Sequence, residues 1–545
     1  MAKKSFRLPS IHSQLLTIVV SLLFAIIFNL RIEVTYLSSF PINDFGTSME
    51  ALAFTTFVFS LLWIFFSSIN FRYLQKIIII IAFLTSASAL YFSLQFNTLF
   101  DESMLNNALE TNTSEAADLL NQSFWMMFIL LGIFPSFVIY KLPVRYPKLL
   151  KNTGLNILSI AAACLLLVTV IAPNYRDFSS FVRNHNVKLK NSLLPYAPVH
   201  SLYKTVSARF FASPIAEKQF DTSAKIISPP SGEKRKSLLI VIVVGETARE
   251  SSFGRVKREY DNRSGFLTDE AELVYLDNVW SCGTNTAASL PCMFSTFGKE
   301  QFQRDYNQKY ENIAELMQRV GYDVTWRDNN SGCKGICDNL KLQPVTLNET
   351  NSKAGLYHDE ILLDNFNDRI TTSGKDQILF LHQMGSHGPA YFKRTPRQYK
   401  KYLPECSSED FAECKPQEIV NAYDNTIIYT NHVLAQTINK LKQLSNQFDT
   451  ALIYLSDHGE STGESGYYLH GIPYFMAPDE QIHIPMLLWF SKGLANSKKI
   501  DMACLQAQRH QRFSHDNFSH TLLGLLDIQT KNYDGQLDLI ADCKI

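Results

Sequence analysis

The segment Ser281–Ser295 reads SCGTNTAASLPCMFS and combines hydroxyl side chains with two cysteines. Cys282 and Cys292 bracket the hydroxyl-bearing residues, so a bond between them would hold the segment at both ends. A threonine hydroxyl is a weak nucleophile at neutral pH, and it becomes effective when a bound metal lowers its pKa and fixes its position. The segment therefore indicates either a stiffened loop or a loop that presents a nucleophile.

Polar side chains that follow two apolar runs could complete a metal site. Glu246 follows the run Leu238–Val244, and Asp457 and His458 follow the run Ala451–Leu455. Sites in open α/β sheets gather at the carboxyl ends of strands, so these side chains are expected to meet. Two carboxylates and an imidazole suit a divalent metal, although each residue alone could equally cap a helix or form a turn.

The elements that must position these residues follow an α/β pattern. After residue 236, short apolar runs alternate with helical stretches, which predicts a central, mostly parallel sheet that is largely buried. The expected strands are Leu238–Val244, Val324–Trp326, Ile378–Leu381, Ala451–Leu455 and Pro485–Phe490. Expected helices include Glu311–Val320 and Glu418–Leu444.

The first 175 residues have a different character, because they carry five long apolar runs. These runs cover approximately 14–30, 51–69, 77–96, 123–140 and 155–173. A helix that spans a bilayer needs about 20 predominantly apolar residues. One such run could be a buried core helix, but five in succession predict an α-helical membrane domain of five transmembrane helices over residues 1–175.

Lys and Arg in the short loops predict the orientation of this membrane domain. Loops 32–50 and 97–122 contain neither residue, whereas the alternate loops and the N-terminus are basic. The basic residues are Lys3, Lys4, Arg7, Arg72, Lys76, Lys141, Arg145, Lys148 and Lys151. The N-terminus is therefore expected in the cytoplasm and, after five crossings, the domain 236–545 outside it.

Cysteine usage gives the same location for the C-terminal domain. Eight of the nine cysteines follow residue 280: Cys282, Cys292, Cys333, Cys337, Cys406, Cys414, Cys504 and Cys543. Short-range pairs favour disulfides, which persist in an oxidising compartment. Buried thiols or a cysteine-rich metal site are the alternative, but the repeated C-x2-C spacing of structural zinc sites is missing.

Residues 176–235 mix aromatic and basic side chains and are expected to link the two domains. They form either an interfacial segment at the membrane surface or a plain linker helix, and the turn-rich stretch Ser228–Lys236 marks the boundary. The formal net charge of the chain is +0, which gives no indication of a nucleic-acid partner.

Six short motifs lie between residues 245 and 461. They are GET at Gly245–Thr247, the segment Ser281–Ser295, DNNS at Asp328–Ser331, HQMGSHGPAY at His382–Tyr391, AYDNTI at Ala422–Ile427 and SDHGES at Ser456–Ser461. Together with the five runs, they resemble membrane-bound phosphoethanolamine transferases of the alkaline phosphatase/sulfatase superfamily. The likeness is strongest to the lipid A-modifying enzymes that confer polymyxin resistance, and it covers nearly the whole chain.

This resemblance implies a metal site and a nucleophile. Zn²⁺ would be held by Glu246, Thr286, Asp457 and His458. Thr286, rather than Thr284, would be the nucleophile. The implied ligands offer three oxygens and one nitrogen, which zinc accepts and manganese would also tolerate.

The resemblance also implies roles for five further residues. His387 and His470 match histidines that lie near the nucleophile or at a second zinc bound during turnover. Asn330, Lys334 and His382 match positions associated with the phosphoethanolamine group. Histidines outside the metal shell can protonate a leaving alkoxide or bind phosphate.

The disulfides of the resembled family imply three pairs in this chain, namely Cys282–Cys292, Cys333–Cys337 and Cys406–Cys414. Cys504 and Cys543 are then expected to pair by elimination.

The implied reaction transfers phosphoethanolamine from phosphatidylethanolamine to a phosphate of lipid A through a covalent phosphoethanolamine–threonine intermediate. The enzyme would be a monomer in the bacterial inner membrane, in contact with membrane lipids, with its catalytic domain in the periplasm. Modified lipid A carries less negative charge, and this weakens the binding of polymyxins and other cationic peptides.

Other functions remain open at this stage. The acceptor could be a lipopolysaccharide core sugar or a Kdo sugar. A glycerol-phosphate transferase of the lipoteichoic-acid type shares five spans and a threonine nucleophile, but such enzymes generally lack this disulfide set. A sulfatase would need a Cys-x-Pro-x-Arg run, which neither Cys282 nor Cys292 begins. A sensor with a degenerate hydrolase domain would usually have lost one of the four ligands.

Overall fold

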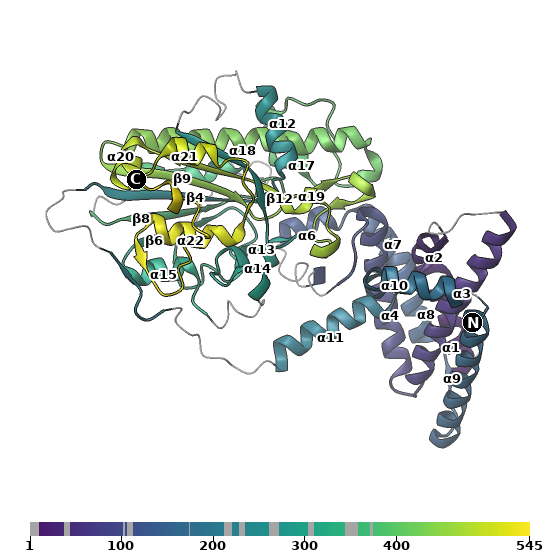
Figure 1. Cartoon of the computed structure of the whole chain (residues 1–545). Coiled ribbons are helices and arrows are strands. Elements are labelled where there is room, and N and C mark those ends of the chain that lie inside the picture. The colour runs from purple at the N-terminus through teal and green to yellow at the C-terminus, as the bar shows by residue number, and fades with distance from the viewer. Residues whose placement is uncertain are drawn as a thin grey trace, which may run out of the picture. The chain divides into compact units, whose positions relative to one another are not determined.

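Contacts within the chain divide it into two units, seen in the computed structural model of Figure 1. The N-terminal unit comprises residues 1–105 and 120–212, and the C-terminal unit comprises residues 106–119 and 213–545. The structure describes residues 10–37, 44–101, 104–105, 113–173, 175–211, 221–227, 235–260, 272–302, 310–343, 358–370 and 374–545.

Within these described residues, four helical stretches of the N-terminal unit are long and apolar enough to cross a membrane. They are Glu50–Ser68 in α3 (Asp44–Ser68), α4 (Gln75–Phe96), Gln122–Lys141 and α9 (Leu149–Ile171). A fifth candidate is a bent pair, Ser13–Phe28 and Leu30–Leu37, whose two parts meet at 55°. The predicted apolar runs therefore form helices. The first run, 14–30, corresponds to Ser13–Phe28, and the chain bends at its end before continuing as Leu30–Leu37.

The bend at the end of the first run lies at Asn29, whose side chain joins the backbone of this run to that of Leu194. Asn29 is 1% exposed, and its Nδ2 donates hydrogen bonds to the carbonyl oxygens of Phe24 (3.0 Å) and Leu194 (2.8 Å). Its Oδ1 accepts a hydrogen bond from the Leu194 N–H at 2.9 Å. Irregular backbone is tolerated at membrane depth only where the protein itself supplies such partners.

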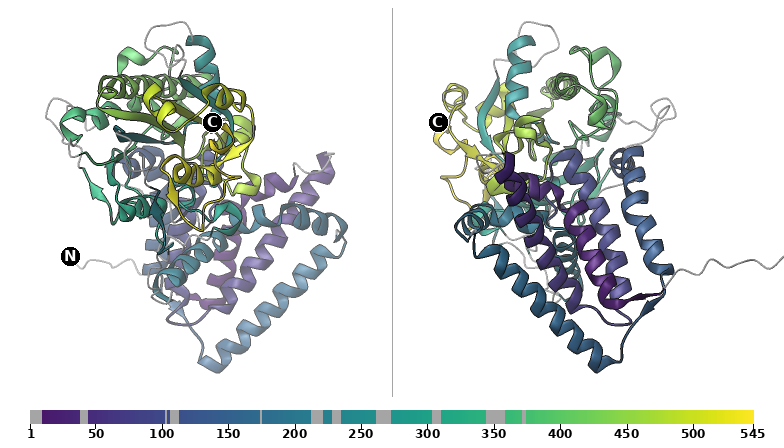
Figure 2. Two further views of the ribbon diagram at one scale, coloured as in Figure 1. Left: turned by 60° about the vertical axis from the view of Figure 1, so that its left-hand side comes forward. Right: turned by 90° about the vertical axis from the view of Figure 1, so that its right-hand side faces the viewer.

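The helices of the N-terminal unit pack through aromatic and aliphatic side chains. Helix α3 packs against α9 and against α1 (Ser13–Leu23), while α4 packs against α8 (Phe134–Lys141). Figure 2 shows the chain from two further directions. Helix α9 leaves Leu150, Leu165 and Val168 more than 60% exposed. A helix face of this composition is stable in lipid rather than in water.

The division into two units differs from the predicted domain boundaries in two places. Helices α10 (Tyr175–Ser192) and α11 (Tyr196–Phe211), in the predicted linker 176–235, belong to the N-terminal unit. Helix α6 (Thr113–Leu119), from the loop between two apolar runs, belongs to the C-terminal unit. The predicted boundary at 228–234 and the basic residues Lys3, Lys4 and Arg7 lie outside the described residues.

The C-terminal unit contains a sheet of eight described strands in the order β13-β5-β12-β9-β4-β8-β6-β7. In chain order these are β4 (Ser237–Gly245), β5 (Leu273–Trp280), β6 (Asp323–Asp328), β7 (Lys341–Leu342), β8 (Gln377–His382), β9 (Phe448–Ser456), β12 (His483–Phe490) and β13 (Phe513–Ser514). Neighbouring strands are parallel except at β12, which is antiparallel to both β5 and β9. The predicted mostly parallel sheet is thus confirmed, and it contains all five predicted strands.

The strand register places the ends of β4, β8 and β9 at one level. Val244 pairs with His382, and Gly245 pairs with Ser456. The residues that follow β4 and β9 therefore leave the sheet side by side, as the sequence predicted.

Both faces of the sheet are covered, which explains the continuous apolar run of β4. Leu238, Ile240, Ile242 and Val244 join one core cluster with side chains of α13 (Thr286–Met293), α15 (Ile313–Val320) and α22 (His515–Leu525). Alternate residues of a strand point to the opposite face. There the long helix α18 (Pro416–Leu444) packs against β9 (Figure 1).

Candidate active site

Glu246, Thr286, Asp457 and His458 lie together at the edge of the sheet where β4 and β9 end. Carboxylate oxygens of Glu246 and Asp457 and a ring nitrogen of His458 lie within 4.8 Å of one another. The Oγ1 atom of Thr286 lies 3.1 Å from Oε2 of Glu246 and 3.4 Å from Nε2 of His458. The structure thus brings together the four side chains that were predicted to bind one metal ion.

The burial of this cluster fits a bound divalent cation. Glu246, Asp457 and His458 are at most 1% exposed. Burial raises the pKa of Asp457 and lowers that of His458 well below its usual value, so a neutral imidazole faces the acidic groups. Oδ2 of Asp457 is buried without a hydrogen bond among the described residues. A zinc ion would neutralise the carboxylates and use this oxygen, and the donor set of oxygens and one imidazole nitrogen suits it.

The backbone after Glu246 adopts a conformation that is rare for a β-branched residue. Thr247 has φ 54°, in the left-handed region. Its N–H donates to Oδ1 of Asp457 at 3.1 Å, and its carbonyl accepts from the Tyr423 hydroxyl at 2.7 Å. The surrounding contacts therefore hold a strained turn that keeps the ends of β4 and β9 together.

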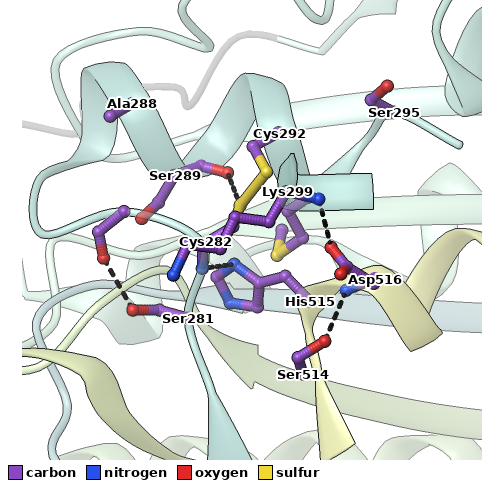
Figure 3. Close-up of a disulfide and its surroundings, with 12 residues drawn as sticks. Ser281, Cys282, Ala288, Ser289, Cys292, Ser295, Lys299, Ser514, His515 and Asp516 are labelled. Carbon is purple, nitrogen blue, oxygen red and sulfur yellow. Dashed lines mark hydrogen bonds between the residues drawn. A yellow bond between two sulfur atoms is a disulfide. The ribbon is translucent and has the colours of Figure 1, made fainter. Parts of the chain in front are cut away.

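Thr286 is the first residue of α13, and the segment around it is fixed at both ends. The side chain of Asn285 caps the helix by accepting the N–H of Ala288 at 3.0 Å. A disulfide joins Cys282, before the helix, to Cys292 in its last turn (Figure 3). The hydroxyl of Thr286 is thus presented from a short helix that is closed by a covalent bond.

His515 connects this segment to the end of β9. Its Nδ1 accepts the backbone N–H of Cys282 at 3.2 Å (Figure 3), and its Nε2 lies 2.9 Å from the carbonyl oxygen of Ser456. An acceptor at Nδ1 and a donor at Nε2 require the neutral ring. Burial, with a smaller contribution from the charge of Lys299, lowers the pKa of His515 to about 4, in agreement with that state.

Two further histidines lie beside the cluster. The ring of His470 is 4.5 Å from that of His458 and 5.3 Å from that of His387, measured between centroids. Nδ1 of His470 lies 2.7 Å from Oε2 of Glu460, and Oε1 of Glu460 accepts the hydroxyl of Tyr391 at 2.6 Å. The carboxylate of Glu460 therefore holds the Nδ1 proton of His470 and sets the ring orientation.

A glycine brings the segment that carries His387 close to Glu246. Gly385 has φ 53°, and a Cβ atom there would lie 2.6 Å from the carbonyl oxygen of Glu246. The next residue, Ser386, donates its N–H to that same oxygen at 3.0 Å. Only glycine permits this approach.

The residues predicted to contact phosphoethanolamine occupy two positions. Asn330 and Lys334 line an open cavity of about 500 Å³. Nδ2 of Asn330 donates to Oε2 of Glu246 at 2.7 Å, so this cavity adjoins the cluster of Glu246, Asp457 and His458. His382 is fully buried beside Asn330. Its Nε2 lies 3.3 Å from Nδ2 of Asn330, and its Nδ1 lies 2.9 Å from Oδ2 of Asp328.

The structure joins the eight C-terminal cysteines into four disulfides, with the pairing that the sequence analysis expected. The bonds are Cys282–Cys292, Cys333–Cys337, Cys406–Cys414 and Cys504–Cys543. Cys333–Cys337 flanks Lys334, so it holds the loop that lines the cavity.

Three supporting residues of the site were not predicted. Glu460 orients His470, Asp328 holds His382, and His515 supports the Thr286 segment. Glu460 and Asp328 lie within the motifs SDHGES and DNNS, so their position next to predicted site residues was a usable signal. His515 lies far from every motif in the sequence, and only the fold brings it to the site.

Two family models match successive parts of the chain. The sulfatase family model matches residues 239–528, and the model described as phosphoethanolamine transferase EptA/EptB matches residues 58–210. Phosphoethanolamine transferase EptA of Escherichia coli (strain K12) is 32% identical over 549 residues, which cover 100% of this chain and 99% of that protein. The chain belongs to the phosphoethanolamine transferase family.

The transferase is similar to further members over most of its length. Phosphatidylethanolamine transferase Mcr-1 of Escherichia coli is 35% identical over 474 residues, 84% of this chain and 85% of that protein. The structure of the integral membrane lipooligosaccharide phosphoethanolamine transferase A (EptA) from Neisseria meningitidis matches with a TM-score of 0.92 and 31% identity. That match covers 98% of this transferase and 100% of the other chain, and it confirms the fold class.

Proposed function

We propose that this transferase moves phosphoethanolamine from phosphatidylethanolamine to a phosphate of lipid A. The observation that carries the proposal is the position of the Thr286 hydroxyl, 3.1 Å from a carboxylate oxygen of Glu246 within the buried cluster. The similar proteins support the substrates, because one is named for phosphatidylethanolamine and another for lipooligosaccharide.

Glu246, Thr286, Asp457 and His458 would hold a zinc ion. When bound, the ion lowers the pKa of a hydroxyl and offsets the negative charge of a phosphodiester. A histidine must be neutral to bind a metal, and the imidazole of His458 is neutral. Oδ2 of Asp457 accepts no hydrogen bond among the described residues and could therefore bind the ion.

In the first half of the reaction, Oγ1 of Thr286 attacks the phosphorus atom of phosphatidylethanolamine. The bond from phosphorus to the glycerol oxygen breaks, and diacylglycerol leaves with a proton from a neighbouring histidine, His387 or His470. The product on the protein is a phosphoethanolamine ester of Thr286. The helix cap and the Cys282–Cys292 bond fix the segment that presents Oγ1, which favours an in-line attack.

In the second half, an oxygen of a lipid A phosphate attacks the same phosphorus atom. The bond to Oγ1 breaks, which leaves this oxygen in the deprotonated state in which it attacked, and lipid A carries the phosphoethanolamine group. The histidine that gave its proton to diacylglycerol can take one from the acceptor, so both halves use the same residues in reverse roles.

The cavity beside the cluster would hold the transferred group. Lys334 supplies a positive charge and Asn330 an amide at this cavity. Lysine binds phosphate as a point charge. The two N–H groups of the Asn330 amide are donated to Glu246 and to the carbonyl oxygen of Gln383, so Asn330 would position Glu246 at the edge of this cavity. His382 would act through Asn330, which it contacts at 3.3 Å.

We further propose that the transferase works as a monomer in the inner membrane, with the C-terminal unit in the periplasm. Both substrates are lipids, which explains why a hydrolase-type domain follows membrane helices. Each transferred group places an ammonium on lipid A, so polymyxins and other cationic peptides bind the modified surface less tightly.

Mass spectrometry of lipid A from cells that express the chain or its Thr286→Ala variant tests the proposal. We expect one added phosphoethanolamine only with the intact chain. Addition to core or Kdo sugars alone would show that the acceptor is wrong. Equal modification by Thr286→Ala would overturn the role of Thr286 as nucleophile.

A further inference from the structure

Asp118 is a buried carboxylate that takes no part in the proposed reaction steps. It lies in α6, which belongs to the C-terminal unit although the chain on either side of residues 106–119 belongs to the N-terminal unit. Its side chain is 9% exposed. Oδ1 accepts a hydrogen bond from Nζ of Lys393 at 2.6 Å, and Oδ2 accepts one from Nη2 of Arg394 at 3.0 Å.

Arg394 connects this carboxylate to His387. Its side chain is 7% exposed, and its Nε donates a hydrogen bond to the carbonyl oxygen of His387 at 3.1 Å. The Nε–H and one Nη2–H bond lie along the same edge of the planar guanidinium group. When Asp118 holds Nη2, it therefore also aims the Nε–H at His387.

The segment that carries His387 depends on such contacts. Residues 383–390 are all described, and they form no helix or strand. The carboxylate of Asp359 holds the first part of the segment, because it accepts the N–H groups of Met384 (2.8 Å) and Gly385 (2.9 Å). Arg394, at the end of α17 (Tyr391–Arg394), holds the carbonyl of His387 itself.

We propose that Asp118 is a positioning residue of the transferase, which acts through Arg394 to hold His387 beside His470. Without the carboxylate of Asp118, the buried guanidinium of Arg394 has no counter-charge. An unpaired buried charge is unfavourable, so the Arg394 side chain would move toward another acceptor or toward water. The carbonyl of His387 then loses its fixed donor. The loop between two apolar runs thus supplies a part of the active site, and this inference rests on the proposed function of His387.

A set of variants of the full chain tests the proposal by the rate of diacylglycerol release from phosphatidylethanolamine. Asp118→Asn removes the negative charge at nearly constant shape. Arg394→Lys keeps the positive charge, but a single ammonium group cannot bind both the carboxylate of Asp118 and the carbonyl oxygen of His387. We expect each to lower kcat by about tenfold with little change in KM, because a small misplacement of a reacting group has effects of this order or larger. The double variant should lose no more than either single one.

Glu409 provides the matched control. Its Oε1 lies 2.5 Å from Nζ of Lys393, so Glu409→Gln removes an ion pair from the same lysine and leaves Arg394 in place. This variant should keep kcat within about twofold of the parent chain, since a partly exposed ion pair contributes little. Equal loss in Glu409→Gln and Asp118→Asn, or an unchanged kcat in Asp118→Asn, would show that Asp118 has only a structural role.

Backbone hydrogen exchange gives a second readout that needs no activity. Asp118→Asn should speed exchange in the peptide around His387 by about tenfold, while peptides of β4 and β9 stay protected. Unchanged exchange in that peptide would overturn the proposal even if the parent chain released no diacylglycerol. Absence of diacylglycerol release from the parent chain, with faster exchange in Asp118→Asn, would instead refute the proposed function alone.

Discussion

At the scale of single residues, the site is defined by acidic groups that the fold encloses. Glu246 is 1% exposed and Asp457 is fully buried, and both lie within 4.8 Å of a ring nitrogen of His458. Two enclosed carboxylates this close repel each other unless a cation lies between them. The stability of the C-terminal unit should therefore depend on a bound metal.

Removal of metal should destabilise the transferase. We expect a strong chelator to lower the unfolding temperature and added zinc to restore it, since saturation at about 100 times Kd contributes roughly 2.7 kcal/mol. Calorimetry with metal analysis measures both effects. Asp457→Asn should abolish the response, whereas Glu360→Gln, which affects a pair with His432 outside the cluster, should keep it. A chelator that leaves the parent chain unchanged would contradict the metal assignment.

His515 should make stability depend on pH. Its pKa is lowered from 6.5 to about 4, so the unfolded chain binds more protons between these values, and stability falls as the pH drops through that window. The full contribution is about 3 kcal/mol. Denaturant unfolding at about pH 7 and about pH 5 measures part of it, and His515→Gln should show a smaller difference. If the free energy of unfolding depended on pH equally in both chains, His515 would not be the source of the dependence.

The sequence was sufficient to predict that the residues proposed to react lie together, and insufficient for some of their supports. Glu246, Asp457 and His458 follow strands whose apolar runs were readable, so their meeting point followed from the topology. The hydrogen bonds of His515 to Cys282 and Ser456 join positions more than 50 residues apart. No local pattern encodes a contact of that kind.

At the scale of elements, the disulfide Cys282–Cys292 closes a stretch that contains Thr286 and most of α13. The two cysteines are 10 residues apart. Helix α13 has only eight residues, and isolated helices of that length are marginal in water. The covalent bond therefore supports the element that presents Thr286, the proposed nucleophile.

Loss of this disulfide should reduce both stability and activity. Replacing Cys282 and Cys292 by serine should lower the free energy of unfolding by about 3 kcal/mol and lower kcat, because Thr286 is no longer fixed. Cys406–Cys414 closes a loop of similar size, 8 residues apart, beside the start of α18. Its double serine variant should lose stability but keep kcat when measured below its unfolding temperature. A similar loss of kcat in both variants would contradict the specific role of the first disulfide.

The elements that sequence patterns missed are those without a uniform pattern. Strand β5 includes Asp277 and Asn278 among its apolar residues, so it resembles neither a buried strand nor an alternating one. The first apolar run was expected to end near residue 30, but a second helix, Leu30–Leu37, continues it at an angle of 55° beyond Asn29. The partner that makes this bend possible is Leu194, and only the folded structure brings it there.

At the scale of the whole molecule, the basic loops predict the orientation in the membrane. In spheroplasts, protease added outside should digest the C-terminal unit, while a tag at the N-terminus should remain protected until the membrane is permeabilised. Moving Lys and Arg from residues 141–151 into the loop 97–122 should weaken this preference. Protection of the C-terminal unit in intact spheroplasts would contradict the predicted orientation and the proposed periplasmic reaction.

The placement of residues 106–119 in the C-terminal unit has a consequence for how such proteins can exchange parts. A chimera that joins the helices of one relative to the catalytic part of another at a single crossover near residue 213 would inherit α6 with the wrong parent. Asp118 of one parent would then have to pair with the arginine at position 394 of the other parent. Natural recombination within the family should therefore tolerate replacement of entire genes more readily than shuffling of their halves.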